Sequence, residues 1–207
     1  FVNPFGAGRS NNPAVLTFIG SGVIDERFSS GLLNSSLIAD GTLFEIPGGP
    51  LKLAIGAQAR IEDFSRATVS FVSGRSPVTG VPIDADRAVL SIFAEVAAPL
   101  VGLANTVPGI ERLDLSAAVR AERYSDFGTT VNPKVGLAWQ PFSGLVLRAS
   151  AGTSFRAPAL FEVRDAPRIS NTQLPALGGG NRQVISLGGG YVDLEPETAK
   201  SLTVSMN

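Results

Sequence analysis

Charged side chains recur at alternate positions within otherwise apolar segments of this sequence. The clearest of them are Lys52, Arg60, Glu62, Asp114, Arg120, Glu122, Arg148 and Arg156. Such groups bind polar solutes, form ion pairs or transfer protons. The chain contains no His and no Cys, which excludes imidazole and thiolate chemistry, including His-based proton transfer and disulfides. We therefore predict a polar contact or permeation surface, with no catalytic residue, no metal site and no cofactor.

The overall composition argues against a nucleic-acid partner and against a membrane-spanning helix. The formal net charge is -1, which gives no reason to expect a nucleic-acid partner. Hydrophobic residues make up 44% of the chain, yet no stretch has the character of a membrane helix. The most apolar segment, 88–104, is shorter than the roughly 18–20 residues of a helical span and contains Glu95 and Pro99. The apolar residues must therefore be spread over many elements, as in a large sheet.

The elements that carry the charges are predicted strands, because apolar and polar residues alternate along them. The clearest runs are 51–62, 113–122, 134–140 and 145–156. A less regular run covers 90–100, and 32–46 alternates only in part, with a bulge that resets it. A further strand begins at 198–205, and 15–24 is a weak strand candidate. We expect about 7–8 antiparallel strands in an up-and-down order.

The length of these runs favours a membrane over water. Strands of soluble proteins average about 5–6 residues, whereas these runs extend for about 10–14. Twelve residues at about 3.3 Å each, tilted by about 45°, climb roughly 28 Å, which matches the hydrocarbon thickness of a bilayer. The apolar faces of the four clearest strands carry no charge, as contact with lipid requires. The opposite faces suit a wet barrel interior.

The connections agree with this interpretation. Short or moderate turns are predicted at Pro47–Pro50, 101–111 and Pro141–Gly144, all on one side of the sheet. Two long connections, 65–86 and 157–194, fall on the other side, together with a turn at Asp126–Thr129. Short turns on one rim and long loops on the other are typical of outer-membrane barrels. An open sheet is not viable in lipid, so we expect residues 1–207 to be part of a larger barrel.

Three segments resemble the C-terminal part of the barrel of TonB-dependent receptors. The first, 36–63, contains the turn FEIPGGP and the strand AIGAQARIE. The second, 91–163, contains SIFAEVAAPL, LDLSAAVRAERYSDFG and VNPKVGLAWQPFSGLVLRAS, and continues into FRAPALFEV. The third, 193–204, is DLEPETAKSLTV, in which Tyr191-Val192 replaces the Asn-Pro that the family's motif places before it.

The resemblance implies a bacterial outer-membrane location in contact with lipid and a barrel of about 22 strands with a separate plug domain. It also implies energised import of a scarce small molecule, such as a siderophore–iron complex or another metal chelate, cobalamin or a saccharide. Coupling to the TonB complex would run through the plug region, which these residues lack. The sequence is not that of an enzyme.

The charged residues allow two interpretations. They could line a permeation route for the ligand, or they could form cross-strand ladders that stiffen the wall, and we favour the ladders. Arg156 could lie on the ligand path, although an interior charge paired at a strand end is the favoured reading. Trp139 and Tyr124 are candidate interfacial aromatics, with Trp139 the better placed. Gly178–Gly180 and Gly188–Gly190 predict a flexible loop, because no phosphate-binding motif follows either.

Two other functions remain open. A passive porin-like barrel would share the strands but lack energy coupling. A soluble β-rich binding or adhesin module would bury the apolar rows against a second layer.

Overall fold

The computed structural model describes residues 12–71, 75–175 and 179–207, so Gly178 of the predicted flexible loop lies outside the described residues. The chain divides into two compact units, one formed from residues 1–31, 63–85 and 160–192, the other from residues 32–62, 86–159 and 193–207. Within the described ranges, neither helix has the length and apolarity that crossing a bilayer would require.

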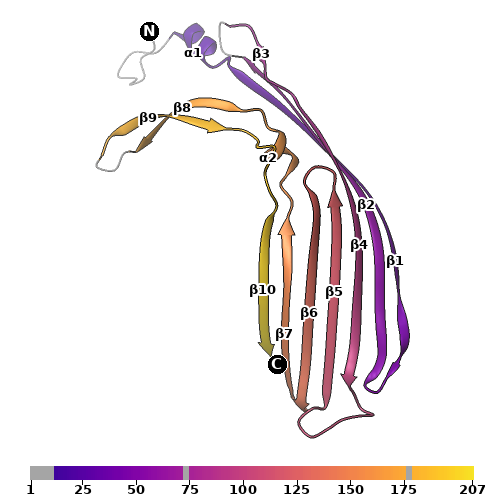
Figure 1. Cartoon of the computed structure of the whole chain (residues 1–207). Helices are drawn as coiled ribbons and strands as arrows, with labels where there is room; N and C mark the ends of the chain where they lie inside the picture. The colour runs from indigo at the N-terminus through magenta and orange to yellow at the C-terminus, as the bar shows by residue number, and fades with distance from the viewer. Residues whose placement is uncertain (1–11, 72–74, 176–178) are drawn as a thin grey trace. The chain divides into compact units, whose positions relative to one another are not determined.

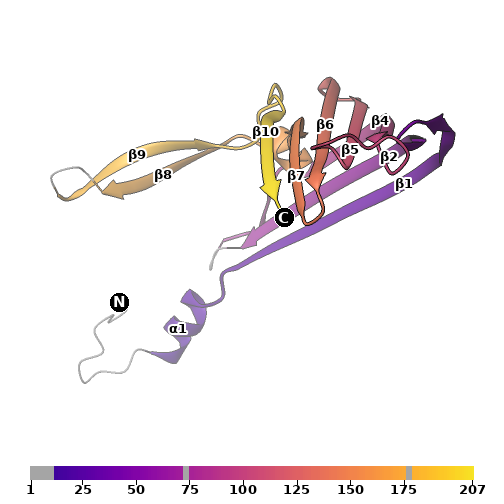
Figure 2. The same cartoon turned by 90° about the horizontal axis from the view of Figure 1, so that it is seen from below.

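One antiparallel sheet of eight strands dominates the described residues (Figure 1). Its main path follows the chain order β1-β2-β4-β5-β6-β7-β10, and the short β3 pairs with β2. The strands are β1 (Val23–Ile46), β2 (Gly49–Phe71), β3 (Val78–Thr79), β4 (Ile83–Val101), β5 (Arg112–Tyr124), β6 (Gly128–Phe142), β7 (Leu145–Arg156) and β10 (Glu197–Met206). The predicted all-β, up-and-down antiparallel fold is confirmed. In the described part β1 and β10 remain as unjoined edges (Figure 2), so the barrel is not closed within these residues.

The strands extend beyond the alternating runs that predicted them. β2 has 23 residues and continues to Phe71, into the segment that was predicted to be a loop from Ser65 to Asp86. β4 likewise begins at Ile83 inside that segment. The loop prediction is therefore wrong at both ends. The backbone ladder continues through 63–71, but apolar and polar residues do not alternate strictly there, so the sequence signal fades.

The weak strand predicted at 15–24 is also wrong. Residues Pro13–Ile19 form helix α1, and the strand begins only at Val23. Asn12 caps this helix, because its Oδ1 accepts a hydrogen bond of 2.9 Å from the backbone N–H of Ala14. Proline at the first helical position, after an Asn cap, is a known start signal that outweighs the apolar run behind it.

The second long connection contains secondary structure of its own. Helix α2 (Leu160–Arg164) is followed by a separate two-stranded sheet of β8 (Arg168–Pro175) and β9 (Asn181–Gly188). The glycines that follow β9 make close contacts: Gly190 N–H donates to the Asp165 carbonyl over 2.9 Å. A Cβ on Gly189 would lie 2.8 Å from the Ala166 carbonyl oxygen. These two glycines thus permit close backbone approach at the base of the hairpin.

The β1–β2 turn also depends on a glycine. A Cβ on Gly48 would lie 1.9 Å from the backbone carbonyl oxygen of Pro99, near the end of β4. We expect Gly48→Ala to lower the free energy of unfolding by about 1–3 kcal/mol, because backbone on both sides has to move. Gly41→Ala is the matched control, since nothing lies within 4 Å of that position. Denaturant unfolding of the two variants in vesicles measures the difference, and equal stabilities would contradict the close approach.

Candidate functional site

The two faces of the sheet differ in how far their side chains are exposed. On β4, the apolar Leu90 and Ile92 are 58% and 60% exposed, whereas the alternate residues Arg87 and Ser91 are each only 2% exposed. The same holds on β5, where Val119 is exposed and Glu122 is buried. A soluble sheet buries its apolar face. Here the apolar row with Leu90, Ile92 and Val119 (the outer face) is uncovered. The opposite face (the inner face) carries the covered side chains, which include Arg87, Ser91 and Glu122 together with the apolar Ile83, Ala85 and Val89.

The inner face holds a dense group of charges near the loop-side ends of the strands. We call this group the loop-side cluster, and it consists of Arg60, Glu62, Arg87, Arg120, Glu122, Tyr124 and Asp126. Arg87 lies at its centre: its Nη2 is 2.6 Å from Asp126 Oδ2, and its Nη1 is 3.7 Å from Glu62 Oε2. Arg87 Nη2 also donates to the Pro158 carbonyl over 2.7 Å. One buried guanidinium thus joins β2, the β5–β6 turn and the chain just after β7.

Aromatic rings complete the surroundings of Arg87. Its guanidinium carbon lies 5.6 Å from the Tyr124 ring centroid and 5.5 Å from that of Phe127, distances at which a cation is attracted to the ring face. The Tyr124 and Phe127 rings stack at 4.3 Å, and Phe155 meets Tyr124 edge-on at 5.7 Å. These rings shield the Arg87 ion pairs from water, which strengthens the attraction.

Four of the charged residues predicted from the sequence form ion pairs within one strand, whereas the favoured ladders would join neighbouring strands. Arg60 and Glu62 approach to 2.7 Å along β2, and Arg120 and Glu122 to 2.8 Å along β5. These ion pairs join residues of the same strand. The links between strands use Arg87, the Arg156–Glu197 ion pair between β7 and β10, or uncharged groups: Ser91 Oγ donates to Glu122 Oε1 over 2.9 Å, and Arg120 Nη2 donates to Gln58 Oε1 over 2.6 Å.

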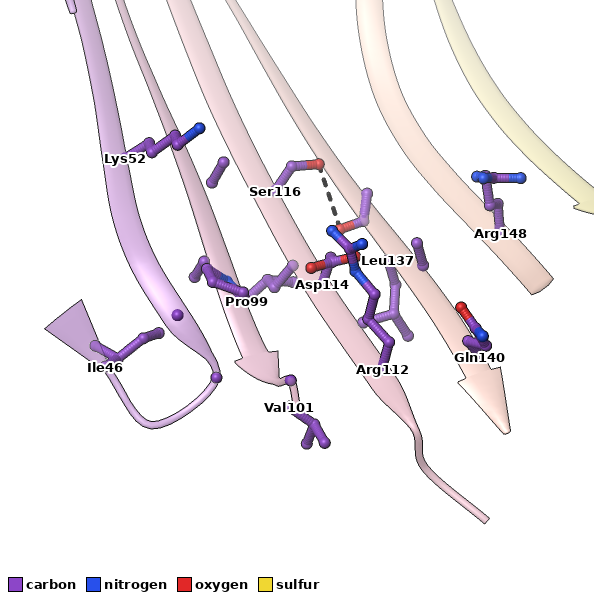
Figure 3. Close-up of a pocket in the computed structure, with 18 of the residues that line it drawn as sticks. Ile46, Lys52, Pro99, Val101, Arg112, Asp114, Ser116, Leu137, Gln140 and Arg148 are labelled. Atoms are coloured by element: carbon purple, nitrogen blue, oxygen red, sulfur yellow. Dashed lines mark hydrogen bonds and ion pairs between the residues drawn. The ribbon is translucent and has the colours of Figure 1, made fainter. Parts of the chain in front are cut away.

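The turn side of the inner face is open instead. A hollow of about 1470 Å³, which we call the turn-side hollow, is lined by residues of β1, β2, β4, β5, β6, β7 and β10. Lys52 and Arg148 stand on opposite sides of it, with Arg112 and Asp114 between them (Figure 3). Arg112 Nε donates to Asp114 Oδ2 over 2.6 Å. Among the described residues, Lys52, Lys134 and Arg148 belong to no ion pair. This wall therefore offers cations to a polar solute or surface.

Residues 4–207 match the family model described as TonB dependent receptor-like, beta-barrel. The chain belongs to this family. No curated protein matches the chain. TonB-dependent receptors act in transport at the bacterial outer membrane, which agrees with a sheet whose apolar face is uncovered and whose charges face inward. The resemblance found in the sequence is confirmed.

Within this receptor segment, the predicted site residues separate into groups. Arg60, Glu62, Arg120 and Glu122 belong to the loop-side cluster, whereas the turn-side hollow is lined by Lys52, Asp114 and Arg148. Arg156 lies apart from both and forms an exposed ion pair with Glu197 of β10, with Nη1 and Oε1 2.9 Å apart.

The two predicted interfacial aromatics of the receptor occupy different surroundings. Trp139 shares the outer face with Leu137 and Val135, and its Nε1 donates to the Gly109 carbonyl over 3.0 Å. Tyr124 is only 5% exposed and lies inside the loop-side cluster, with Arg60 Nη2 3.4 Å from its hydroxyl. The structure thus places Tyr124 among charges, whereas the prediction placed it at a membrane interface.

Sequence reasoning missed the residues at the centre of the receptor's loop-side cluster. Arg87 continues the alternation of Val89 and Ser91 by one step, so extending the predicted strand toward the N-terminus would have found it. Asp126 lies in a turn, where alternation gives no signal, and its pairing with Arg87 depends on the tertiary structure. Lys134 was recognised as polar, but its place in the turn-side hollow follows only from the sheet.

Proposed function

We propose that this chain forms part of the wall of an energised importer in the bacterial outer membrane. The remaining strands and the plug would be supplied by residues outside these 207. The observation that carries the proposal is the uncovered apolar outer face of the sheet, with Leu90 and Ile92 exposed on the same strand that buries the charged Arg87 on the inner face. Side chains of this kind on an outward face suit acyl chains, and a charged inward face suits an aqueous lumen.

The ligand class that this wall supports is polar and small. The turn-side hollow presents Lys52, Lys134 and Arg148, together with hydroxyl and amide groups. Metal chelates, cobalamin and saccharides all carry the hydrogen-bonding groups that such a wall can contact. The loop-side cluster has its charges occupied by one another, so we assign it to holding the wall together rather than to ligand contact.

Uptake measurements in cells test this function. Cells that carry the complete receptor are supplied separately with radiolabelled ferric citrate, cobalamin and maltodextrin, and are compared with cells that lack its gene. We expect receptor-dependent accumulation of one of these solutes, and we expect it to stop when the TonB complex is deleted or the proton gradient is dissipated. Receptor-dependent uptake that persists without the gradient would instead establish a passive barrel. Recovery of the receptor in the aqueous fraction without detergent would exclude a membrane protein altogether.

A further inference from the structure

The outer face carries two cations among its apolar rows. Arg123 of β5 lies directly opposite Leu90 of β4 and Thr129 of β6, on the row that also contains Val119. Lys200 of β10 lies opposite Thr153 of β7, on the row of Leu202 and Val204. Directly opposed residues in an antiparallel sheet share a face, so both cations point outward with the apolar residues.

Neither cation has an acidic partner. In the described part of the chain, Arg123 and Lys200 take part in no ion pair or side-chain hydrogen bond. The nearest acid along the outer row of β4 is Asp86, four positions beyond Leu90. That position lies past the level of the β5–β6 turn, because the Ala88 carbonyl already accepts from Ser125 N–H of that turn over 3.0 Å. On β5 and β10 the first charges met from the apolar band toward the loop side are therefore positive, whereas on the outer row of β2 the first is the acidic Asp63.

The position of Arg123 matches the edge of a bilayer. Leu113, opposite Trp139, marks the turn-side end of the outer row of β5, and Arg123 marks its loop-side end. The two are about 10 residues apart, which is about 33 Å along the strand and about 23 Å of height at a tilt near 45°. The apolar band of outer-membrane barrels is about 25 Å tall. Arg123 thus falls at headgroup level. Lys200 lies in register with Val119, four positions nearer the middle of the band, and its long stem extends its ammonium toward the headgroups.

We propose that Arg123 and Lys200 bind the phosphate groups of anionic lipids in the leaflet on the loop side. This inference rests on the proposed membrane location and adds to it the chemistry of the lipid that the wall prefers. Guanidinium and ammonium groups at an interface attract anionic headgroups, and Arg matches a phosphate with two parallel hydrogen bonds. The partners are lipids rather than free phosphate, because both cations lie on rows whose other members are mostly apolar.

Lipid enrichment around the complete receptor tests the proposal. The receptor is inserted into vesicles of phosphatidylcholine mixed with phosphatidylglycerol, extracted in mild detergent, and its co-purifying lipids are quantified by mass spectrometry. The double variant Arg123→Gln/Lys200→Gln is compared with Lys52→Gln/Arg148→Gln, which removes the same charge from the inner face. We expect phosphatidylglycerol enrichment to fall about fivefold for each outward cation removed, and to be unchanged in the inner-face variant.

The outcomes separate the inference from the function on which it rests. Insertion into vesicles of phosphatidylcholine alone tests the membrane location, and failure of the wild-type receptor to insert there would count against the proposed function. If the receptor inserts but the outer-face variant keeps the wild-type enrichment, the lipid site is overturned. Equal losses in the two double variants would show a general effect of charge and would also overturn it. Added inorganic phosphate that abolishes the enrichment at constant ionic strength would point to a free-anion site instead.

Discussion

Replacing Arg87 by Ala is expected to lower the free energy of unfolding by about 3–5 kcal/mol, because it breaks a buried set of ion pairs and leaves its acids unpaired. Arg87 is the most enclosed charge of the loop-side cluster, at 2% exposure. Without it, Asp126 loses a partner at 2.6 Å and the Pro158 carbonyl loses a donor at 2.7 Å. The Tyr124 and Phe127 rings would then enclose a cavity instead of a cation.

Unfolding of the receptor by guanidinium chloride in vesicles measures this loss. The matched control is Arg112→Ala, because the Arg112–Asp114 pair is of similar length, 2.6 Å, but its side chains are 64% and 32% exposed. Exposed pairs contribute about 0–1 kcal/mol, so the control should unfold nearly as the wild type does. Arg87→Lys should fall between the two, since an ammonium keeps the charge but cannot hold Asp126 and Pro158 in the same planar geometry. A loss for Arg87→Ala no larger than for the control would contradict the central role of Arg87.

The second large effect on the free energy of unfolding is expected when a charge is placed at the middle of the outer face. Ala117 lies opposite Val96 and Val135 on the outer face, and we expect Ala117→Arg to cost about 2–4 kcal/mol, the cost of an arginine at the bilayer midplane. The neighbouring Ala118 lies opposite Glu95 and Lys134 on the inner face. Ala118→Arg should cost less than about 1 kcal/mol, because water and a carboxylate are at hand.

These two variants differ by one position and carry the same substitution, so helix or strand propensity cannot explain a difference between them. The measurement is unfolding in lipid vesicles, with insertion checked by the gel mobility of the folded barrel. If Ala118→Arg were the more damaging change, the inner face would be a packed apolar-type core and the orientation of the sheet would be reversed.

The sequence predicted the strands best where the two faces of the sheet differ in polarity. The run 145–156 coincides with β7, and 113–122 lies within β5, because apolar residues of the outer face alternate there with polar or small residues of the inner face. Beyond Glu62, β2 continues to Phe71 without that contrast, and the strand was taken for a loop. The β8–β9 hairpin is exposed on both faces, so its residues carried no periodic signal either.

The candidate site was predicted only in part, for a related reason. Alternation identifies which side chains share the inner face, and it found Lys52, Asp114 and Arg148 of the hollow. It does not reveal which charges neutralise one another, because that depends on register and on turns. The pairing of Arg87 with Asp126 joins β4 to a turn that lies 39 positions away along the chain. Tyr124 shows the same limit: the sequence offered it only as a candidate interfacial aromatic, and it is the tertiary structure that brings Phe127 and Phe155 against it.

Nitroxide labels can measure directly which face of β5 contacts lipid and which contacts water. The chain contains no Cys, so single cysteines at Ala117 and Ala118 can be labelled without competition from these residues. In the membrane-inserted receptor, we predict that the label at Ala117 collides with oxygen dissolved in lipid and is shielded from a water-soluble nickel chelate. The label at Ala118 should show the opposite preference, and labels along 115–120 should alternate. Labels at both positions that meet the nickel chelate equally, or a preference of the reverse sign, would contradict a wall with lipid on one side and water on the other.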